Sequence, residues 1–204
     1  MKNIYFMISH TNTKLGKLIR FCSNYQYNHI SVCANSSLQP MYSFARYNYN
    51  SPFVGGFVEE SILRYLYHGR STKVRIYRIE VNEEQFEKYR LIIESHLKES
   101  KKYIYNTFGI FHSNIYSARY RQTCLSFAVS ILKDLDILSQ KVDIRTIKKL
   151  EEHLSSFSHT DTILLNRENH THVWGDDKYY ERVPISKVLM DTCIHFYKLI
   201  FLFK

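Results

Sequence analysis

The residue best placed to do chemistry in this chain is Cys124, which stands at the start of a predicted helix. Counting from Cys124, apolar residues recur at positions 127, 128, 131, 132 and 135, a spacing that puts them on one helical face. A helix N-terminus carries unpaired N–H groups and partial positive charge, which favour a thiolate and a developing oxyanion. Cysteine is also among the most buried residue types, so a plain core role for Cys124 is the alternative.

A histidine that could act as the base for Cys124 lies on a predicted strand, residues 29–34. Ile30 and Val32 share the apolar face of this strand, which leaves His29 and Ser31 on the other face. A lone histidine in a strand is usually structural. However, imidazole is the usual proton acceptor for a thiol nucleophile. The two residues together therefore predict a nucleophile–base pair.

A third polar group is expected to orient the imidazole. Residues 41–46 are predicted to form the strand that returns from the histidine strand in a hairpin, and Ser43 is its best polar candidate. Arg46 is a poorer candidate, and Asn28 and Gln122 are options outside this strand. The sequence leaves the hairpin register open, so these alternatives remain beside Ser43.

The elements that must position these residues are strands and helices in mixed order. Strands are predicted at residues 4–9, 29–34, 41–46 and 73–81, helices at 12–22, 82–101, 123–138 and 143–156, and a loop at 157–183. This order predicts an α+β fold with an antiparallel sheet or small barrel packed against helices. Residues 1–140 are the predicted catalytic domain, and residues 141–204 a helical and loop extension packed on the same domain.

Four short segments of the chain resemble a known enzyme group. Residues 27–32, 41–46 and 54–58 resemble the first half of the permuted NlpC-type (YiiX-like) papain-fold cysteine peptidases, and residues 123–128 resemble the start of their nucleophile helix. In that group the histidine strand precedes the cysteine helix, which is the reverse of ordinary papain-like enzymes. This chain has the same order, and the resemblance covers roughly residues 4–137.

This resemblance implies a circularly permuted papain-like fold with a Cys-His-polar trio and neither metal nor cofactor. Cys124 matches the nucleophile and His29 the base. The third position in the group is often a glutamate or histidine, whereas this chain offers Ser43, a weaker orienting group. Peptidase, amidase, thioesterase and acyltransferase activities occur in the group and its relatives by fold. The expected function is therefore a cysteine hydrolase or acyltransferase acting on a small-molecule, peptide or lipid-like acyl substrate.

The charge and cysteine content narrow the class of protein. The formal net charge is +9, but the 28 lysines and arginines are dispersed along the chain. Because a nucleic-acid footprint is a clustered patch or stripe, we do not expect a nucleic-acid partner. Nothing at the N-terminus resembles a secretory signal, and the four cysteines form no CxxC pair. A cytoplasmic protein with reduced thiols is expected.

Three alternatives remain open. His170 and His172 lie near Asp176 and Asp177 and could bind a metal, although a solvated polar loop is favoured for this segment. A catalytically silent binding module on the same fold is the second alternative. The apolar residues 194–204 are expected to pack on the domain, and contact with a membrane surface or a partner is the less favoured reading. The sequence gives no indication of the oligomeric state.

Overall fold

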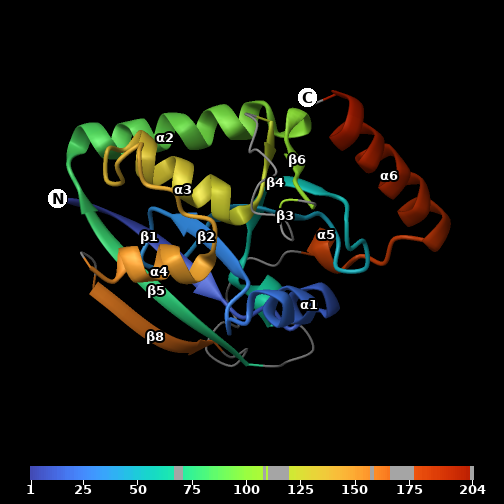
Figure 1. Ribbon diagram of the computed structural model, residues 1–204, viewed down its shortest axis with the longest axis horizontal. Coiled ribbons are helices and arrows are strands. Elements are labelled where there is room, and N and C mark those ends of the chain that lie inside the picture. Colours follow the sequence, from blue (N-terminus) through green and yellow to red (C-terminus); the bar gives the residue numbers. More distant parts are fainter. Residues whose placement is uncertain (67–70, 108, 110–119, 157–158, 166–176, 203–204) are drawn as a thin grey trace.

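The centre of the molecule is a six-stranded antiparallel sheet with strand order β4-β3-β2-β1-β5-β8. The computed structural model describes residues 1–66, 71–107, 109, 120–156, 159–165 and 177–202 (Figure 1). The strands of the sheet are β1 (Lys2–Ser9), β2 (His29–Cys33), β3 (Met41–Arg46), β4 (Gly55–Glu60), β5 (Thr72–Val81) and β8 (His159–Leu165). Within the described residues β4 and β8 remain edges of an open sheet, so the α+β class is confirmed and the small barrel is not formed.

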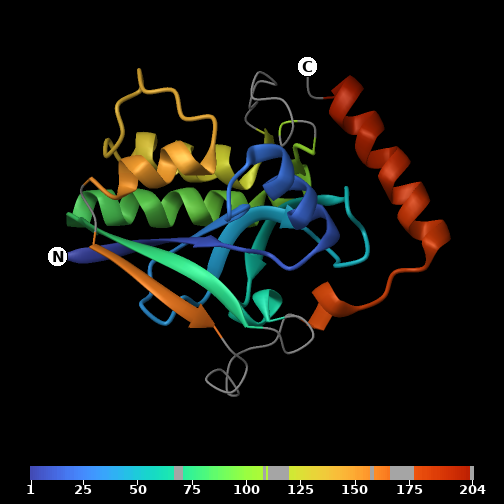
Figure 2. The same ribbon diagram turned by 60° about the horizontal axis from the view of Figure 1, so that its bottom comes forward.

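One face of the sheet carries helices and holds the larger core. The α-helices of the described chain are α1 (Lys14–Ser23), α2 (Glu83–Lys98), α3 (Cys124–Asp134), α4 (Ile147–Leu154), α5 (Asp177–Tyr180) and α6 (Ile185–Tyr197), and three of them cover this face. Figures 1 and 2 show α2, α3 and α4 together on this face. Phe6 and Val32 from the sheet are buried against Phe127 of α3 and Leu150 of α4. Alternate residues of β1 and β2, such as Ile4 and Ile30, point to this face.

The opposite face of the sheet has a smaller core that is covered by the 3-10 turn Ile62–Tyr65. Met7, Met41 and Val74 are buried there with Tyr65. The alternate residues of β2 point to this second face. The same alternation that buries the apolar side chains of β2 therefore sends the polar ones, His29 among them, toward Tyr65.

A second, two-stranded sheet lies beside the start of α3. Its parallel strands β6 (Ile104–Tyr105) and β7 (Arg121–Gln122) pair Tyr105 with Gln122, which is followed at once by the N-cap residue of α3. This pairing fixes the entry of the chain into α3. It also brings Tyr105 close to the helix N-terminus.

Residues 157–183, predicted as a loop, contain a strand and a short helix. β8 pairs with β5 in antiparallel register, with Ile163 opposite Val74. The polar residues of this edge strand hid it from a search for apolar alternation. The later segment, residues 177–183, docks by the Tyr49 N–H donating to the Tyr179 carbonyl at 2.9 Å. Helix α6 and the π-helical turn Lys198–Leu202 then end the described chain at the side opposite the N-terminus (Figures 1 and 2).

A search of the described helices for a membrane-crossing segment found none with the necessary length and apolar character.

Candidate active site

Cys124 is the first residue of α3, as the apolar spacing predicted. A reciprocal capping box holds the chain there: the Thr123 hydroxyl accepts from the Ser126 N–H at 3.0 Å, and the Ser126 hydroxyl accepts from the Thr123 N–H at 2.8 Å. The first helical bond of α3 runs from the Phe127 N–H to the Thr123 carbonyl. The N–H groups of Cys124 and Leu125 therefore precede every intrahelical acceptor and point out of the helix end.

His29 begins β2, and its backbone is fixed by its neighbour. The Asn28 N–H donates to the Ser9 carbonyl at 3.0 Å, which continues the β1–β2 ladder in which Ser9 lies opposite His29. The Cys124 side chain lies near enough to the His29 ring to raise the pKa of that ring. The structure therefore brings the two residues together although 95 positions separate them in the sequence.

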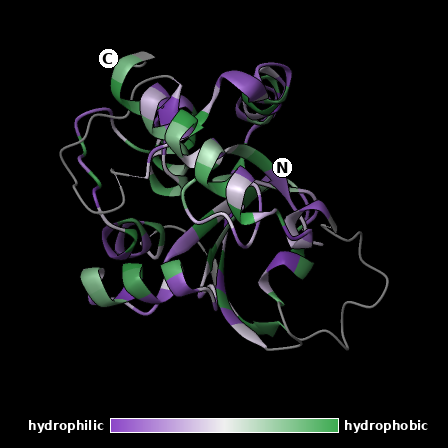
Figure 3. Ribbon diagram, turned by 90° about the vertical axis from the view of Figure 1, so that its right-hand side faces the viewer, coloured by the Kyte–Doolittle hydropathy of each residue, from purple (hydrophilic) through white to green (hydrophobic). Residues whose placement is uncertain are grey.

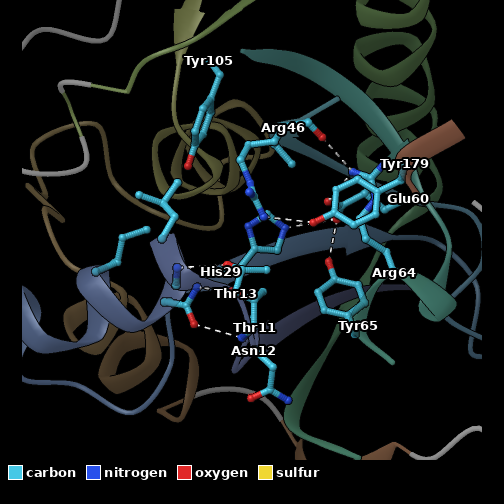
Figure 4. Close-up of a pocket in the computed structure, with 15 residues that line it drawn as sticks. Thr11, Asn12, Thr13, His29, Arg46, Glu60, Arg64, Tyr65, Tyr105 and Tyr179 are labelled. Carbon is cyan, nitrogen blue, oxygen red and sulfur yellow. Dashed lines mark hydrogen bonds and ion pairs between the residues drawn. The ribbon is translucent and has the colours of Figure 1, made fainter. Parts of the chain in front are cut away.

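The second partner of His29 is Glu60, the last residue of β4. The Glu60 Oε2 atom accepts from His29 Nε2 at 3.1 Å, from the Ser31 hydroxyl at 2.6 Å and from the Tyr65 hydroxyl at 2.6 Å. Oε1 accepts from Arg64 Nη1 at 3.2 Å. The carboxylate is 1% exposed, and this full set of donors makes its burial tolerable (Figure 4).

The charges of this cluster depend on one another. Burial disfavours a charged His29 ring, but Glu60 and then Cys124 outweigh this effect and raise the pKa of His29 to about 10. Burial likewise opposes ionisation of Glu60, yet His29 and Arg64 hold the pKa of that carboxyl well below its usual range. At neutral pH this arrangement favours a protonated His29 ring beside an ionised Glu60 carboxylate.

Glu60 stands where Ser43 was expected, and the prediction for the third position is thereby corrected. Ser43 is buried in β3, and its hydroxyl has no hydrogen-bond partner among the described residues. It lies opposite Val58 in β4, two residues before Glu60. The carboxylate reaches the His29 ring from there, whereas the Ser43 hydroxyl does not contact it.

The other candidates for the third position have different partners. Asn28 accepts from Arg20 at 2.7 Å and donates to the Thr11 hydroxyl at 2.6 Å, so it ties α1 to the loop after β1. Arg46 donates to the Tyr49 carbonyl and the Tyr179 hydroxyl, each at 3.0 Å. Gln122 lies in β7, where its carbonyl accepts from the Asn106 N–H.

Two adjoining cavities open on the two sides of the pair. The larger, of about 230 Å³, is lined by Cys124 and by a mixture of apolar, aromatic, polar and cationic side chains. The smaller, of about 60 Å³, is lined by His29 and Glu60. Asn28 and Tyr105 line both, so the cavities meet beside the thiol and the imidazole.

Tyr105 adds a hydroxyl to the junction. Figure 4 shows this hydroxyl pointing into the cavity. Burial, followed by the charge on Cys124, raises the pKa of Tyr105, so its hydroxyl keeps its proton and is available as a donor. The sequence analysis did not single out Tyr105.

The remaining cysteines differ from Cys124 in their surroundings. Cys22 and Cys193 are exposed, and all four cysteines are free. Cys33 is buried, donates weakly to the Asn35 carbonyl at 3.4 Å, and burial raises the pKa of its thiol to about 12. Among the described residues, a histidine that influences a cysteine is shown for Cys124 alone.

A metal site is not evident in the part of the chain that the structure describes, since no cluster of three or more histidine, cysteine, aspartate or glutamate side chains is found there. The alternative based on His170, His172 and Asp176 lies outside the described residues, as does the side chain of Asp177.

Comparison of the chain with protein-family models, with curated proteins and with solved structures gave no match. The case for a function therefore rests on the geometry of the site.

Sequence reasoning missed Glu60, although a signal for it exists. No strand was predicted between those at residues 41–46 and 73–81. Yet Phe57 is an apolar residue after two glycines, and the two-residue period from Val58 places Glu60 on the same face as Val58. A carboxylate at the end of such a run, on the strand after the predicted hairpin, was the signal that could have found it.

Proposed function

We propose that this protein is a cysteine hydrolase or acyltransferase of the permuted papain-like type, in which Cys124 is the nucleophile, His29 the base and Glu60 the orienting group. One observation supports this most: His29 lies between a thiol at a helix N-terminus and a buried carboxylate. Glutamate is also a common third residue in the permuted NlpC-type group, which strengthens the resemblance.

In the proposed reaction the first step is attack by the Cys124 sulfur on an acyl carbon. Glu60 binds Nε2 of His29, so Nδ1 is the ring atom that takes the Cys124 proton, which gives a thiolate–imidazolium pair. The thiolate forms a bond to the carbonyl carbon, and the bond to the leaving nitrogen, oxygen or sulfur then breaks. The His29 imidazolium gives its proton to that leaving atom, a step worth roughly 10²–10⁴ in rate.

The negative charge that develops on the carbonyl oxygen needs donors. The N–H groups of Cys124 and Leu125 at the start of α3 are suitable, and the Tyr105 hydroxyl is a third donor at the junction of the cavities. Losing one donor of this kind typically costs about 10²–10³ in turnover. Water, or the hydroxyl or amine of an acceptor, then attacks the acyl-enzyme, and neutral His29 takes its proton.

The larger cavity indicates where the acyl group would be held. Ile19, Tyr27 and Ile147 give it an apolar lining, and Arg145 and Lys148 are cationic residues in its wall. This combination suits an acyl group with an apolar portion and a nearby anionic or polar group. The proposal covers esters, thioesters and amides of such groups.

The experiment that tests the proposal is a burst assay with p-nitrophenyl acetate. We expect one equivalent of nitrophenol to be released rapidly and the acetyl group to be found on Cys124 by peptide mass spectrometry. Cys124→Ala and His29→Ala variants should show no burst. A variant in which Cys22 and Cys193 are both replaced by alanine should keep it.

The catalytically silent binding module is the competing function on the same fold. It predicts a folded protein in which p-nitrophenyl acetate acetylates Cys124 no faster than the exposed Cys22. That result would remove the enzyme proposal and leave the two cavities as a binding site.

A further inference from the structure

A third cavity adjoins the cavity of His29 and extends away from Cys124. It has a volume of about 450 Å³, and its walls come from the start of α1, the segment between β3 and β4, and Tyr179 of α5. Arg46 and Tyr179 line both this cavity and the cavity of His29. None of the described residues in its wall also lines the cavity of Cys124, so the three cavities follow one another with His29 in the middle one. Figure 3 faces the side of the molecule on which α1 and α5 lie in Figure 1.

The charged side chains in the wall of the third cavity are cationic. Among the described residues of this wall they are Lys14 and Arg46, and no carboxylate is found there. Lys14 is exposed, whereas Arg46 is half-buried. The cavity of His29 has one carboxylate in its described wall, Glu60, which is already paired with both His29 and Arg64. The described walls therefore leave the charges of Lys14 and Arg46 without a counter-ion.

The Arg46 guanidinium is held in place by neutral acceptors. Its Nη1 atom donates to the Tyr49 carbonyl and its Nη2 atom to the Tyr179 hydroxyl, each at 3.0 Å. Figure 4 shows the bond to Tyr179 in the cavity that His29 lines. No carboxylate of the described chain bonds to this guanidinium, so N–H donors of its fork are available to oxygen atoms of a ligand.

Arg46 also acts on the groups at which the reaction is proposed. Burial raises the pKa of Tyr105 most and the charge on Cys124 raises it further, whereas the charge on Arg46 opposes this rise. Tyr105 lies where the cavities of Cys124 and His29 meet. The guanidinium is therefore within electrostatic reach of the place where the acyl bond would break.

We propose that the third cavity binds the leaving group of the acyl substrate, and that Arg46 and Lys14 select a leaving group that bears a carboxylate or a phosphate. This inference rests on the proposed reaction, in which Cys124 keeps the acyl group and His29 gives its proton to the leaving atom. The acyl group then occupies the cavity of Cys124, and the leaving group extends past His29 toward Arg46. The substrate class is an ester, thioester or amide of an anionic alcohol, thiol or amine.

Acetyl esters with neutral and anionic leaving groups test this proposal. The probes are phenyl acetate, p-acetoxybenzoate and p-acetoxyphenyl phosphate, which share one acyl group. After correction for alkaline hydrolysis, we expect an anionic ester to acylate Cys124 with kcat/KM roughly 10- to 100-fold above that of phenyl acetate. The preferred anion tells a carboxylate from a phosphate. Arg46→Gln should abolish the preference, and Lys14→Gln should reduce it by roughly two- to fivefold.

Arg78→Gln is the matched control. Arg78 is exposed on β5 and is not among the described residues that line the three cavities. Its substitution removes the same charge and should leave the preference unchanged. Circular dichroism confirms that the variants are folded. Because the Lys14 side chain is exposed, Lys14→Gln keeps the proposal testable should Arg46→Gln fail to fold.

Binding to Cys124→Ala separates this inference from the proposed reaction. Calorimetry compares phenol with p-hydroxybenzoate and p-hydroxyphenyl phosphate, the leaving groups themselves. We expect an anion to bind more tightly than phenol, and adding Arg46→Gln, but not Arg78→Gln, to remove the difference. That result without acylation of Cys124 would overturn the reaction and leave an anion site beside His29. Equal binding of phenol and both anions, or equal effects of Arg46→Gln and Arg78→Gln, would overturn the leaving-group proposal.

Discussion

Glu60 is the residue whose replacement most sharply separates an oriented catalytic base from an ordinary histidine. In Glu60→Gln the Nε2 atom of His29 loses its carboxylate partner, so the pKa of His29 should fall from about 10 toward its ordinary value. We expect the nitrophenol burst to slow by at least about tenfold while Cys124 remains the acylated residue. A histidine titration by NMR and the burst assay measure the two effects.

The same substitution should also change stability, and with a defined pH dependence. Removing one partner of a buried ion pair typically costs about 3–5 kcal/mol. The pKa of His29 is raised on folding, so the protonated ring stabilises the folded state through its contact with Glu60. This stabilisation is fully present below about pH 6.5 and is lost as the pH rises through about 10. The difference in unfolding free energy between the unmodified chain and Glu60→Gln should therefore shrink over that range. Urea titrations at neutral and alkaline pH measure it, and a constant difference would contradict the charged pair.

Ser43→Ala provides the contrast to Glu60→Gln. The Ser43 hydroxyl is buried without a hydrogen-bond partner among the described residues, so removing it should change stability by no more than about 1 kcal/mol. The burst rate should stay within about twofold of that of the unmodified chain. A loss comparable to that of Glu60→Gln would return the orienting role to Ser43.

The residues that sequence reasoning could predict are those whose position follows from local periodicity. Cys124 was found from the apolar spacing of one helix, and the facing of His29 from the alternation of one strand. To predict Glu60, the relative placement of β2, β3 and β4 would have to be known. In the structure only Val32 and Tyr42 form a matched pair between β2 and β3, so simple hairpin extrapolation from Ser43 could not find it.

At the scale of elements, the start of α3 positions the nucleophile. Thr123→Ala removes the hydroxyl that caps the Ser126 N–H, and loss of such a cap typically costs about 1 kcal/mol. Since Cys124 is the next residue, we expect the burst rate to fall together with stability. Thermal unfolding and the burst assay measure the two effects.

Thr123→Ser is the control for this prediction, because serine keeps the capping oxygen. It should preserve both the stability and the burst rate. A Thr123→Ala variant that is less stable but reacts at the normal rate would show that the cap serves only the fold.

The strands with an apolar run or with alternating polarity, β1, β2, β3 and β5, could be predicted from the sequence, as could the helices with one apolar stripe. β4 and β8 could not, for two different reasons. β4 begins with two glycines that signal a turn, yet the Tyr103 carbonyl would lie only 2.6 Å from a Cβ at Gly56. Close packing therefore demands glycine there. β8 is an edge strand whose first half is polar, so its sequence does not predict a strand. Its hydrogen bonds to β5 hold it in the extended conformation.

At the scale of the whole molecule, residues beyond 140 contribute to the same core as those before it. Leu150 and Leu154 of α4 are fully buried against the sheet, and Leu165 of β8 is buried in the second core. Leu154→Ala should therefore cost about 2–5 kcal/mol, as for a central core residue. Chemical denaturation followed by circular dichroism measures this cost, and a loss below about 1 kcal/mol would indicate a loosely attached extension.

The most direct test of the central claim is the order in which iodoacetamide alkylates the four cysteines at neutral pH. The structure supplies the references, because Cys22 and Cys193 are exposed, whereas Cys33 is buried and burial raises the pKa of its thiol to about 12. The account predicts that Cys124 reacts first despite being only 6% exposed, and that His29→Ala abolishes this lead. Faster alkylation of Cys22 and Cys193, with Cys124 as slow as Cys33, would contradict it.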